Sequence, residues 1–394
     1  MFEYFPDNYN WSLAVALAMG MGGEPSEIDS ACRPLRQVAG AAVDDATQRV
    51  WFDSWTQVAD RLEEMAARDA AAGKVRSATR KRRRVAAYHL MAERMMSNLS
   101  PLKMASYEKA LGAFHWATRG DAVEFMEVPY ADAPLPALFV AGHGTGKRPC
   151  LVFFNGYDVT KEVLYLMGLG ELAARGISVL LCDQPGSGGA LRLHGQRTRF
   201  DMEVPAAACF EAMAARADVD ARRIAIGGIS MGGYFAPRAA SVEHRFAACV
   251  AWGAFHDLLG VAANLAQTGA HSAPPFQVAW VFGMNQEKLI GVAPNFNLDR
   301  VIGEMTCPLL VVHGESDRQV PVAQARRTHE MATSSSRRDL LVFPKGSWGE
   351  EHCQVDDPTL AIDAIADWLE QVLGSRPRRA KGAGECILCL HRIQ

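Results

Sequence analysis

The sequence predicts an α/β fold, with a mainly parallel sheet flanked by helices, that follows a helical N-terminal region. Residues 1 to about 120 are rich in Ala, Glu and Arg, with apolar residues at helical spacing. After residue 121, continuously apolar runs alternate with amphipathic segments, which is typical of parallel strands covered on both faces. The 394 residues, 49% of them hydrophobic, suffice for one large domain with an appendage or for two domains.

Two helices are expected in the N-terminal region. In WFDSWTQVADRLEEMAARDA, residues 51–70, apolar side chains recur at helical spacing with charges between them. A second such segment runs from about Ala78 through Met96. It contains the basic run RKRRR, Arg80 to Arg84, which lacks the interleaved aromatic residues that stack on nucleic-acid bases. We therefore expect this run to form a solvated helix face.

Strands and helices alternate after residue 121. The expected elements, in chain order, are the hairpin AVEFMEVPY and LPALFVAGH, the strand CLVFFNG, the helix TKEVLYLMGLGELAARG ending at Gly176, the strand ISVLLCDQPG, the helix EVPAAACFEAMAARADVD, the strands RRIAIGG, FAACVAWGA, PLLVVHGESD and DLLVFPKGS, and the helix PTLAIDAIADWLEQVLG. Residues from about 257 to 304 interrupt this alternation. We expect them to form an insertion over one end of the sheet.

Charge, hydropathy and cysteine content argue against several classes of function. A net charge of −3 does not suit a dedicated nucleic-acid binder. The apolar run from Trp11 to Met19 is too short to span a bilayer, and no basic region precedes it. The nine cysteines are an odd number scattered along the chain, which suits reduced thiols packed as small hydrophobes. We expect a cytoplasmic protein without a signal peptide that binds neither membranes nor nucleic acids.

The composition shifts toward basic and small residues at 375–394, and we expect a flexible tail there. Cys386, Cys389 and His391 give one C-x-x-C with a nearby histidine. A structural zinc site needs about four ligands, and no second ligand pair follows at the usual spacing. We therefore expect no metal, and the sequence indicates no cofactor.

The pentapeptide Gly228-Ile229-Ser230-Met231-Gly232 fits the pattern G-x-S-x-G between an expected strand and an expected helix. A nucleophile on such a sharp turn needs small neighbours two positions away, and the turn lifts its hydroxyl clear of the sheet. The first backbone amides of the following helix favour negative charge at the same place. A glycine-rich turn with an incidental serine is the alternative, but the strand–helix context favours Ser230 as a nucleophile.

A nucleophilic serine needs a general base, and the base needs an acid that orients it. In PLLVVHGESDRQVP, Asp317 follows a buried strand, with Glu315 as its competitor. In FPKGSWGEEHCQ, His352 lies in a loop before the last helix. The chain order Ser, Asp, His favours Asp317 and His352 as the partners of Ser230. His313, at the end of a strand, is expected to be structural.

Two backbone amides are expected to form an oxyanion hole. One belongs to Met231, directly after the serine. The other comes from the loop FFNGYDVTKE, where Gly156 permits a close turn and Tyr157 offers its N–H. A simple strand–helix turn with Thr160 as N-cap also describes this loop, and both descriptions can hold. DQPGSGG lacks the Lys-Ser/Thr ending of a phosphate-binding loop and is expected to be a tight turn at the site entrance.

These motifs resemble a known group of α/β-hydrolases. FNGYDVTKE, DQPGSGG, GGISMGGYFAPRAA, HGESD and the opening YFPDNYNW are similar to segments of the 2,6-dihydroxypseudooxynicotine hydrolase, fungal heptaketide hydrolase and FrsA-like group. The resemblance implies the triad and oxyanion roles assigned above. It also implies an α/β-hydrolase fold with a helical cap at residues 1–120 and a catalytic domain at 121–374, which carries the cap insertion at about 257–304.

Two chemistries fit the same residues. The resemblance favours hydrolysis of a carbon–carbon bond beside a ketone, in a 1,3-dicarbonyl or polyketide-like small molecule. Hydrolysis of an ester or thioester with a small apolar acyl group stays open, because only the leaving group differs. A non-catalytic binding protein would most naturally lack a triad member, and none is missing.

The segment after the strand ACVAWGA is the candidate contact for the leaving ketone. We expect His256 and Asp257 either to bind this group or to belong to a loop that caps the next helix. The expected partner is a small-molecule substrate, and a homodimer stays open.

Overall fold

The computed structural model describes residues 2–41 and 44–374, within which eight strands form one sheet in the order β1-β2-β4-β3-β5-β6-β7-β8. β1 and β2 form the expected hairpin, β2 pairs antiparallel with β4, and the other neighbours are parallel. The strands are β1 (Val123–Val128), β2 (Leu135–Val140), β3 (Arg148–Phe154), β4 (Ser178–Cys182), β5 (Val219–Ile229), β6 (Cys249–Trp252), β7 (Leu309–Gly314) and β8 (Arg338–Phe343).

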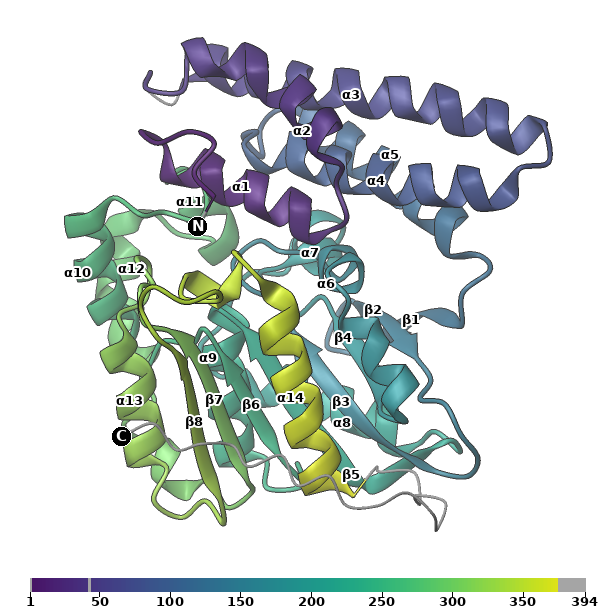
Figure 1. Ribbon diagram of the computed structural model, residues 1–394. Helices are drawn as coiled ribbons and strands as arrows, with labels where there is room; N and C mark the ends of the chain where they lie inside the picture. Colours follow the sequence, from purple (N-terminus) through teal and green to yellow (C-terminus); the bar gives the residue numbers. More distant parts are fainter. Residues whose placement is uncertain (1, 42–43, 375–394) are drawn as a thin grey trace.

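Helices cover both faces of the sheet, which explains why the central strands are apolar without alternation (Figure 1). One face packs against α6 and α14, and the other packs against α8, α9 and α13. The helices around the sheet are α6 (Lys161–Leu166), α7 (Gly188–Arg192), α8 (Glu203–Ala214), α9 (Met231–Val242), α13 (Val322–Met331) and α14 (Pro358–Leu373). The chain is therefore an α/β-hydrolase-type fold, as predicted.

The N-terminal helices lie together over the end of the sheet where the parallel strands finish (Figure 1). We call this region the cap. Its helices are α1 (Tyr9–Gly20), α2 (Pro25–Cys32), α3 (Asp45–Ala71), α4 (Val75–Arg94) and α5 (Pro101–Thr118). The expected insertion follows β6, lies near α1, and contains α10 (Leu258–Thr268), α11 (Gln277–Phe282) and α12 (Gln286–Val292). Among the described residues, no helix is long and apolar enough to cross a membrane.

Some helices differ from the sequence prediction. The single helix expected to end at Gly176 is divided, because Gly168 has φ 102° and ends α6 before a 3-10 helix (Leu169–Arg175). Helix α13 was not predicted because few of its residues are apolar, and only Ala325 and Thr328 are buried. Helix α1 shows no helical periodicity because it is buried on most of its surface.

The basic run in α4 is neutralised by acidic residues and is not the solvated face that we expected. Four consecutive side chains of the run form ion pairs, which are Lys81–Asp69, Arg82–Glu63, Arg83–Asp121 and Arg84–Glu27. Pairing with acids of the same protein leaves these four cations with little excess charge for an external polyanion.

One apolar cluster joins the cap to the sheet. It includes Trp51 and Trp55 of α3, Val163 of α6, Trp252 of β6 and Trp368 of α14. The cap and this face of the sheet therefore share a core, and the position of the cap over the strand ends is fixed by packing.

A buried group of ion pairs also holds the cap in place. Arg192 of α7 pairs with Asp158 at 2.6 Å and with Glu93 of α4. Lys103 of α5 pairs with the same Glu93. These four side chains are almost fully buried, so each charge depends on its partners for compensation.

We expect Arg192→Met to lower the free energy of unfolding by about 3–5 kcal/mol, because it leaves buried carboxylates without a partner. Chemical denaturation with a fluorescence readout measures this change. Arg49→Met is the matched control, since Arg49 forms an exposed ion pair with Asp53. Its substitution should leave the free energy of unfolding almost unchanged. Equal denaturation midpoints for the Arg192 variant and the wild type would contradict the structural role of the buried group.

Candidate active site

Ser230 occupies the sharp turn that the sequence predicts. It lies between the end of β5 and the start of α9, with φ 56° and ψ −115°. A positive φ is strained for a residue with a side chain, and such strain is concentrated at functional sites. The two flanking glycines are required by space. A Cβ at Gly228 would lie 2.2 Å from the carbonyl oxygen of Gly232, and a Cβ at Gly232 would lie 2.4 Å from that of Phe154.

Gly232→Ala should destabilise the protein by about 1–3 kcal/mol, because the backbone of β3 must move to accept the added methyl group. We expect a lower melting temperature and a loss of the turn geometry at Ser230. Gly112→Ala in α5 is the control, since nothing lies within 4 Å of its added Cβ. That variant should be up to about 1 kcal/mol more stable than the wild type. A Gly232 variant as stable as the control would show that the turn tolerates a side chain.

The structure brings Ser230, His352 and Asp317 into one hydrogen-bonded chain. The distance from Ser230 Oγ to His352 Nε2 is 2.9 Å, and that from His352 Nδ1 to Asp317 Oδ2 is 2.6 Å. The second carboxylate oxygen of Asp317 accepts hydrogen bonds from the backbone amides of Gln319 and Val320, each at 2.8 Å. In this arrangement Nδ1 donates to the carboxylate and Nε2 is free to accept the serine proton.

Burial and charge act in opposite directions on the pKa values of this pair. Burial disfavours the protonated imidazole of His352, but the negative charge of Asp317, the neighbouring Cys353 and the hydrogen bonds to both together outweigh it and hold the pKa well above the usual value. Burial also opposes ionisation of Asp317, but His352 and the hydrogen bonds hold the pKa of the carboxyl below its usual value. The pair therefore favours a charged carboxylate beside an imidazole of raised basicity.

The neighbouring acid and histidine have other partners. Glu315, the competitor of Asp317, accepts a hydrogen bond from the backbone amide of Lys345 at an exposed position. His313 is buried, donates from Nε2 to the carbonyl of Val320 at 2.8 Å, and has a pKa lowered by burial. It supports the loop that carries Asp317, which agrees with the structural role expected for it.

A cavity of about 60 Å³ lies beside the serine hydroxyl. The catalytic part of the chain contributes Tyr157, Ser230 and His352 to its lining. Helices of the cap contribute Leu13 and Arg94. The cap therefore forms part of the wall around the candidate nucleophile, and much of that wall is apolar.

The loop after β3 runs directly against the nucleophile. A Cβ at Gly156 would lie 3.2 Å from the Cβ of Ser230, so the glycine permits this close approach. The loop is anchored from behind by Asp183, which accepts hydrogen bonds from the side chain of Asn155 at 2.7 Å and from Nζ of Lys161 at 2.9 Å. The backbone N–H groups of Tyr157 and Met231 stay predicted as oxyanion donors.

The segment DQPGSGG differs from its expected position. Its first residue, Asp183, is fully buried and supports the β3 loop, and Gly188 begins the short helix α7. Gly188 has φ 44°, and a Cβ there would lie 2.1 Å from the carboxyl carbon of Asp183. The segment therefore supports the loop from within, and it does not line the cavity beside Ser230.

His256 and Asp257 have structural contacts in place of the expected contact with the leaving ketone. The ring of His256 is buried between Thr328, at 3.1 Å, and Asp299, at 2.8 Å. The side chain of Asp257 accepts a hydrogen bond from the backbone amide of Gly260 and caps α10. Neither residue lines the cavity beside Ser230, so the capping alternative describes this segment.

Two features of the site were missed in the sequence. The thiol of Cys353 lies 3.3 Å from Nε2 of His352, beside Ser230, and this residue has φ 52°. Arg94 reaches the cavity from the end of α4. The only sequence signal for Arg94 was a charge inside the apolar run YHLMAERMM. The tail cysteines Cys386 and Cys389 lie outside the described residues.

The fold and the hydrogen-bonded residues Ser230, His352 and Asp317 can be compared with known proteins. A model of the prolyl oligopeptidase family matches residues 167–376, more than half of the chain. The chain belongs to the prolyl oligopeptidase family. The matched part includes Ser230, Asp317 and His352, whereas the cap lies outside it.

Proteins that are similar in sequence to this chain are named hydrolases. The chain is 37% identical over 147 residues to the hydrolase pyiE of Pyricularia grisea, which covers 36% of this chain and only 30% of pyiE. It is 25% identical over 341 residues to the 2,6-dihydropseudooxynicotine hydrolase of Paenarthrobacter nicotinovorans, covering 84% of this chain and 87% of that protein. We conclude that the chain is a hydrolase.

A solved structure is similar over almost the whole chain. The crystal structure of the 2,6-dihydroxy-pseudo-oxynicotine hydrolase matches with a TM-score of 0.73 and 22% identity, covering 91% of this chain and 95% of that one. At this identity the likeness shows the fold. It extends the comparison beyond the family match to the helical cap, because the aligned region exceeds the α/β part.

Proposed function

We propose that the chain is a serine hydrolase that cleaves a carbon–carbon bond beside a ketone in a small 1,3-dicarbonyl substrate. The observation that carries the hydrolase mechanism is the hydrogen-bonded chain Ser230–His352–Asp317 at a cavity roofed by the cap. The carbon–carbon preference is supported by the group that the motifs resemble and by the apolar wall of the cavity. The pyiE alignment spans under a third of that protein, so it adds no substrate.

The proposed reaction begins with proton transfer from Ser230 to His352 and attack of Oγ on one carbonyl carbon. The backbone amides of Tyr157 and Met231 stabilise the negative oxygen that forms. The carbon–carbon bond then breaks, its electron pair leaves as an enolate, and His352 returns the proton to the enolate carbon. Water hydrolyses the acyl-enzyme with His352 again as base, giving a carboxylic acid and a ketone.

An ester or thioester with a small apolar acyl group is the second candidate, because it uses the same nucleophile, base and oxyanion hole. The leaving group alone distinguishes the two reactions. An alkoxide or thiolate takes its proton on oxygen or sulfur, whereas an enolate needs stabilisation of the charge on its own carbonyl oxygen.

Rates of product formation separate these candidates. The wild type and Ser230→Ala are incubated with an aryl 1,3-diketone and with the ester of the same acyl group, and products are identified by mass spectrometry. We expect the wild type to give acid and ketone from the diketone, and the variant to give neither. If kcat/KM for the ester is greater by a hundredfold or more, about 2.7 kcal/mol of transition-state preference, the protein is an esterase.

A further inference from the structure

Arg94 carries a buried positive charge that no carboxylate of the described residues pairs with. Arg94 is the last residue of α4 and lines the cavity beside Ser230. Only 7% of its surface is exposed. Its Nη2 donates to the carbonyl oxygen of Ser272 at 2.6 Å, whereas its Nε has no hydrogen-bond partner. A buried guanidinium stays protonated, so this charge is buried without a carboxylate in direct contact.

The nearest carboxylates are already used by other cations. Glu93 and Asp158 pair with Lys103 and Arg192 in the buried group described above. With Arg94, three cations share these two carboxylates, and neither carboxylate forms an ion pair with Arg94 itself. Burial lowers the pKa of Arg94, as expected for a charge that burial penalises, and a bound anion would relieve this penalty.

A second polar group without a partner lines the same cavity. The hydroxyl oxygen of Tyr157 is buried and makes no hydrogen bond in the described structure. Burial, then the charge of Asp158, raises its pKa, and the charge of Arg94 opposes this shift. The phenol therefore stays protonated and can donate, and it shares the lining of the cavity beside Ser230 with Arg94.

We propose that Arg94 and the Tyr157 hydroxyl together bind the oxygen of the leaving ketone and stabilise the enolate that forms there. This inference rests on the function proposed above and assigns its leaving-group site. When the bond between the attacked carbonyl carbon and the leaving carbon breaks, its electron pair passes to the enolate oxygen, which then faces two donors. His352 delivers the proton to carbon, which releases the neutral ketone.

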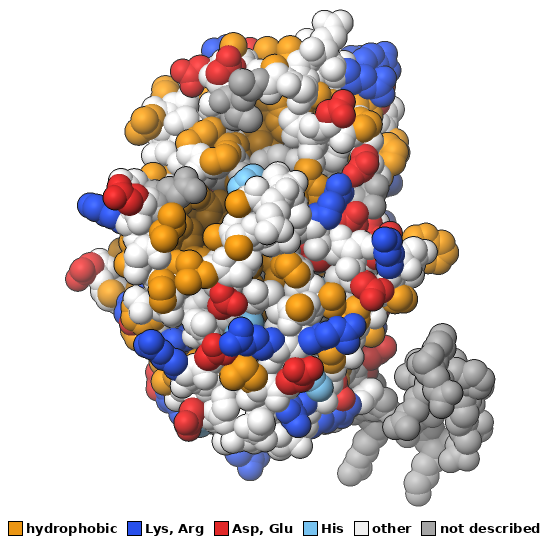
Figure 2. Space-filling view, turned by 90° about the vertical axis from the view of Figure 1, so that its left-hand side faces the viewer, with side chains coloured by type: hydrophobic (Ala, Val, Ile, Leu, Met, Phe, Trp, Pro, Cys, Tyr) orange, Lys and Arg blue, Asp and Glu red, His pale blue; other side chains and the backbone are white. Residues whose placement is uncertain are grey.

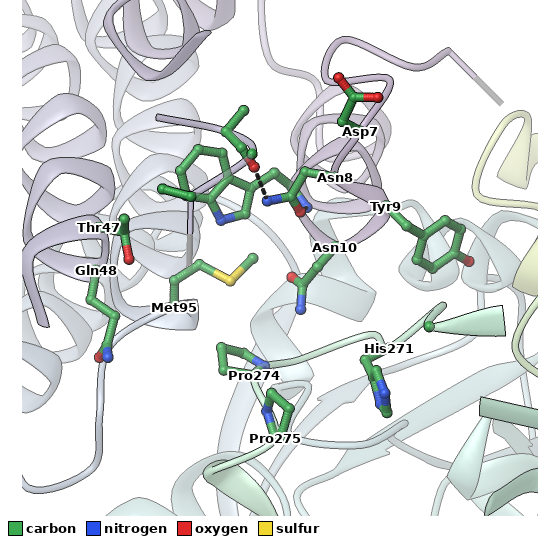
Figure 3. Close-up of a pocket in the computed structure, with 15 residues that line it drawn as sticks. Asp7, Asn8, Tyr9, Asn10, Thr47, Gln48, Met95, His271, Pro274 and Pro275 are labelled. Atoms are coloured by element: carbon green, nitrogen blue, oxygen red, sulfur yellow. Dashed lines mark hydrogen bonds between the residues drawn. The ribbon is translucent and has the colours of Figure 1, made fainter. Parts of the chain in front are cut away.

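A larger cavity of about 300 Å³ is lined by residues of the cap and of the insertion. Figure 3 shows Met95, next in sequence to Arg94, and His271, next to Ser272, on its wall together with Asn10 of α1. The residues next in sequence to Arg94 and Ser272 therefore line the larger cavity, whereas Arg94 and Ser272 line the one beside Ser230. Figure 2 shows a hollow in the surface of the protein with hydrophobic side chains around it.

The test compares Arg94→Met, Arg94→Lys and Tyr157→Phe with the wild type on an aryl 1,3-diketone and on the ester of the same acyl group. We expect Arg94→Met to lower kcat/KM for the diketone about 100-fold or more and to change the ester rate by less than about 5-fold. Arg94→Lys should recover part of the diketone rate, because it restores charge without the planar fork. Tyr157→Phe should lower the diketone rate about 10-fold.

Inhibition by cyclohexane-1,3-dione, an enolate at neutral pH, gives a readout that needs no carbon–carbon cleavage. Its inhibition constant against ester hydrolysis should rise about 10-fold or more in Arg94→Met and stay unchanged in the surface control Arg49→Met. Melting temperatures and labelling by a fluorophosphonate probe show whether each variant is folded with an intact nucleophile. If Arg94→Met fails these controls, the comparison is made with Arg94→Lys and Tyr157→Phe.

The two proposals fail in different ways. Equal losses on diketone and ester, or an unchanged inhibition constant in Arg94→Met, overturn the enolate site and leave the hydrolase mechanism standing. A wild type that hydrolyses the ester, cleaves no diketone and binds the dione through Arg94 overturns the carbon–carbon assignment, and it shows that the anion site itself exists.

Discussion

Ser230→Ala should abolish labelling by a fluorophosphonate probe and lower kcat about 10⁶-fold, the largest effect that we expect from a single substitution. The reason is that Oγ is the only hydroxyl held 2.9 Å from Nε2 of His352 in the described structure, at a turn that points it into the cavity. Labelling is followed by intact-protein mass spectrometry and turnover by ester hydrolysis. The fold should persist, because the hydroxyl of Ser230 makes no other hydrogen bond within the described structure.

His352→Ala should lose about as much activity, and the double variant should lose little more, since triad members act as a unit. Ser241→Ala is the matched control. That serine lies in the same helix, α9, and donates to the carbonyl of Pro237 at 2.6 Å, away from the cavity. It should keep probe labelling. A Ser230 variant with the turnover of the wild type would require a different nucleophile.

The sequence predicted the α/β architecture because burial on both faces removes alternation from β3, β4 and β5, and such runs are easily separated from amphipathic helices. It also predicted the position of Ser230, since the two glycines that the turn requires are local in the chain. The choice of Asp317 over Glu315 followed from chain order, and it agrees with the 2.6 Å contact between Asp317 and His352, whereas Glu315 binds the backbone amide of Lys345.

The parts of the site that depend on contacts between distant segments could not be predicted. Arg94 reaches the cavity only because the cap folds over the strand ends, and its lack of an anionic partner depends on how Glu93 and Asp158 are used. His256 is similar. Its position after a strand suggested a substrate contact, but the ring turns inward to Asp299, which lies 43 positions further along the chain.

The shape of the pH–rate profile depends on Asp317. His352 must be neutral to accept the serine proton. At pH values below the pKa of this histidine in the free enzyme, kcat/KM therefore decreases. Because Asp317 holds that pKa well above its usual value near 6.5, the acid limb of the wild-type profile should lie above pH 6.5. Asp317→Asn removes the negative charge and leaves burial, which lowers the pKa, so the acid limb should move to lower pH.

The same substitution should lower kcat about 10⁴-fold at the plateau, because an amide no longer holds the imidazole in the tautomer that accepts from Ser230. The profile is measured with an ester substrate between pH 5 and about 9, the range in which a histidine of shifted pKa titrates. Glu315→Gln is the matched control, since this exposed acid binds the backbone amide of Lys345 and does not contact His352. Its acid limb should coincide with that of the wild type.

If Asp317→Asn keeps both the acid limb and the plateau of the wild-type profile, Asp317 is not the acid that orients the base. A change in Glu315→Gln of the kind expected for Asp317→Asn would assign that role to Glu315 instead, against the 2.6 Å contact between His352 and Asp317.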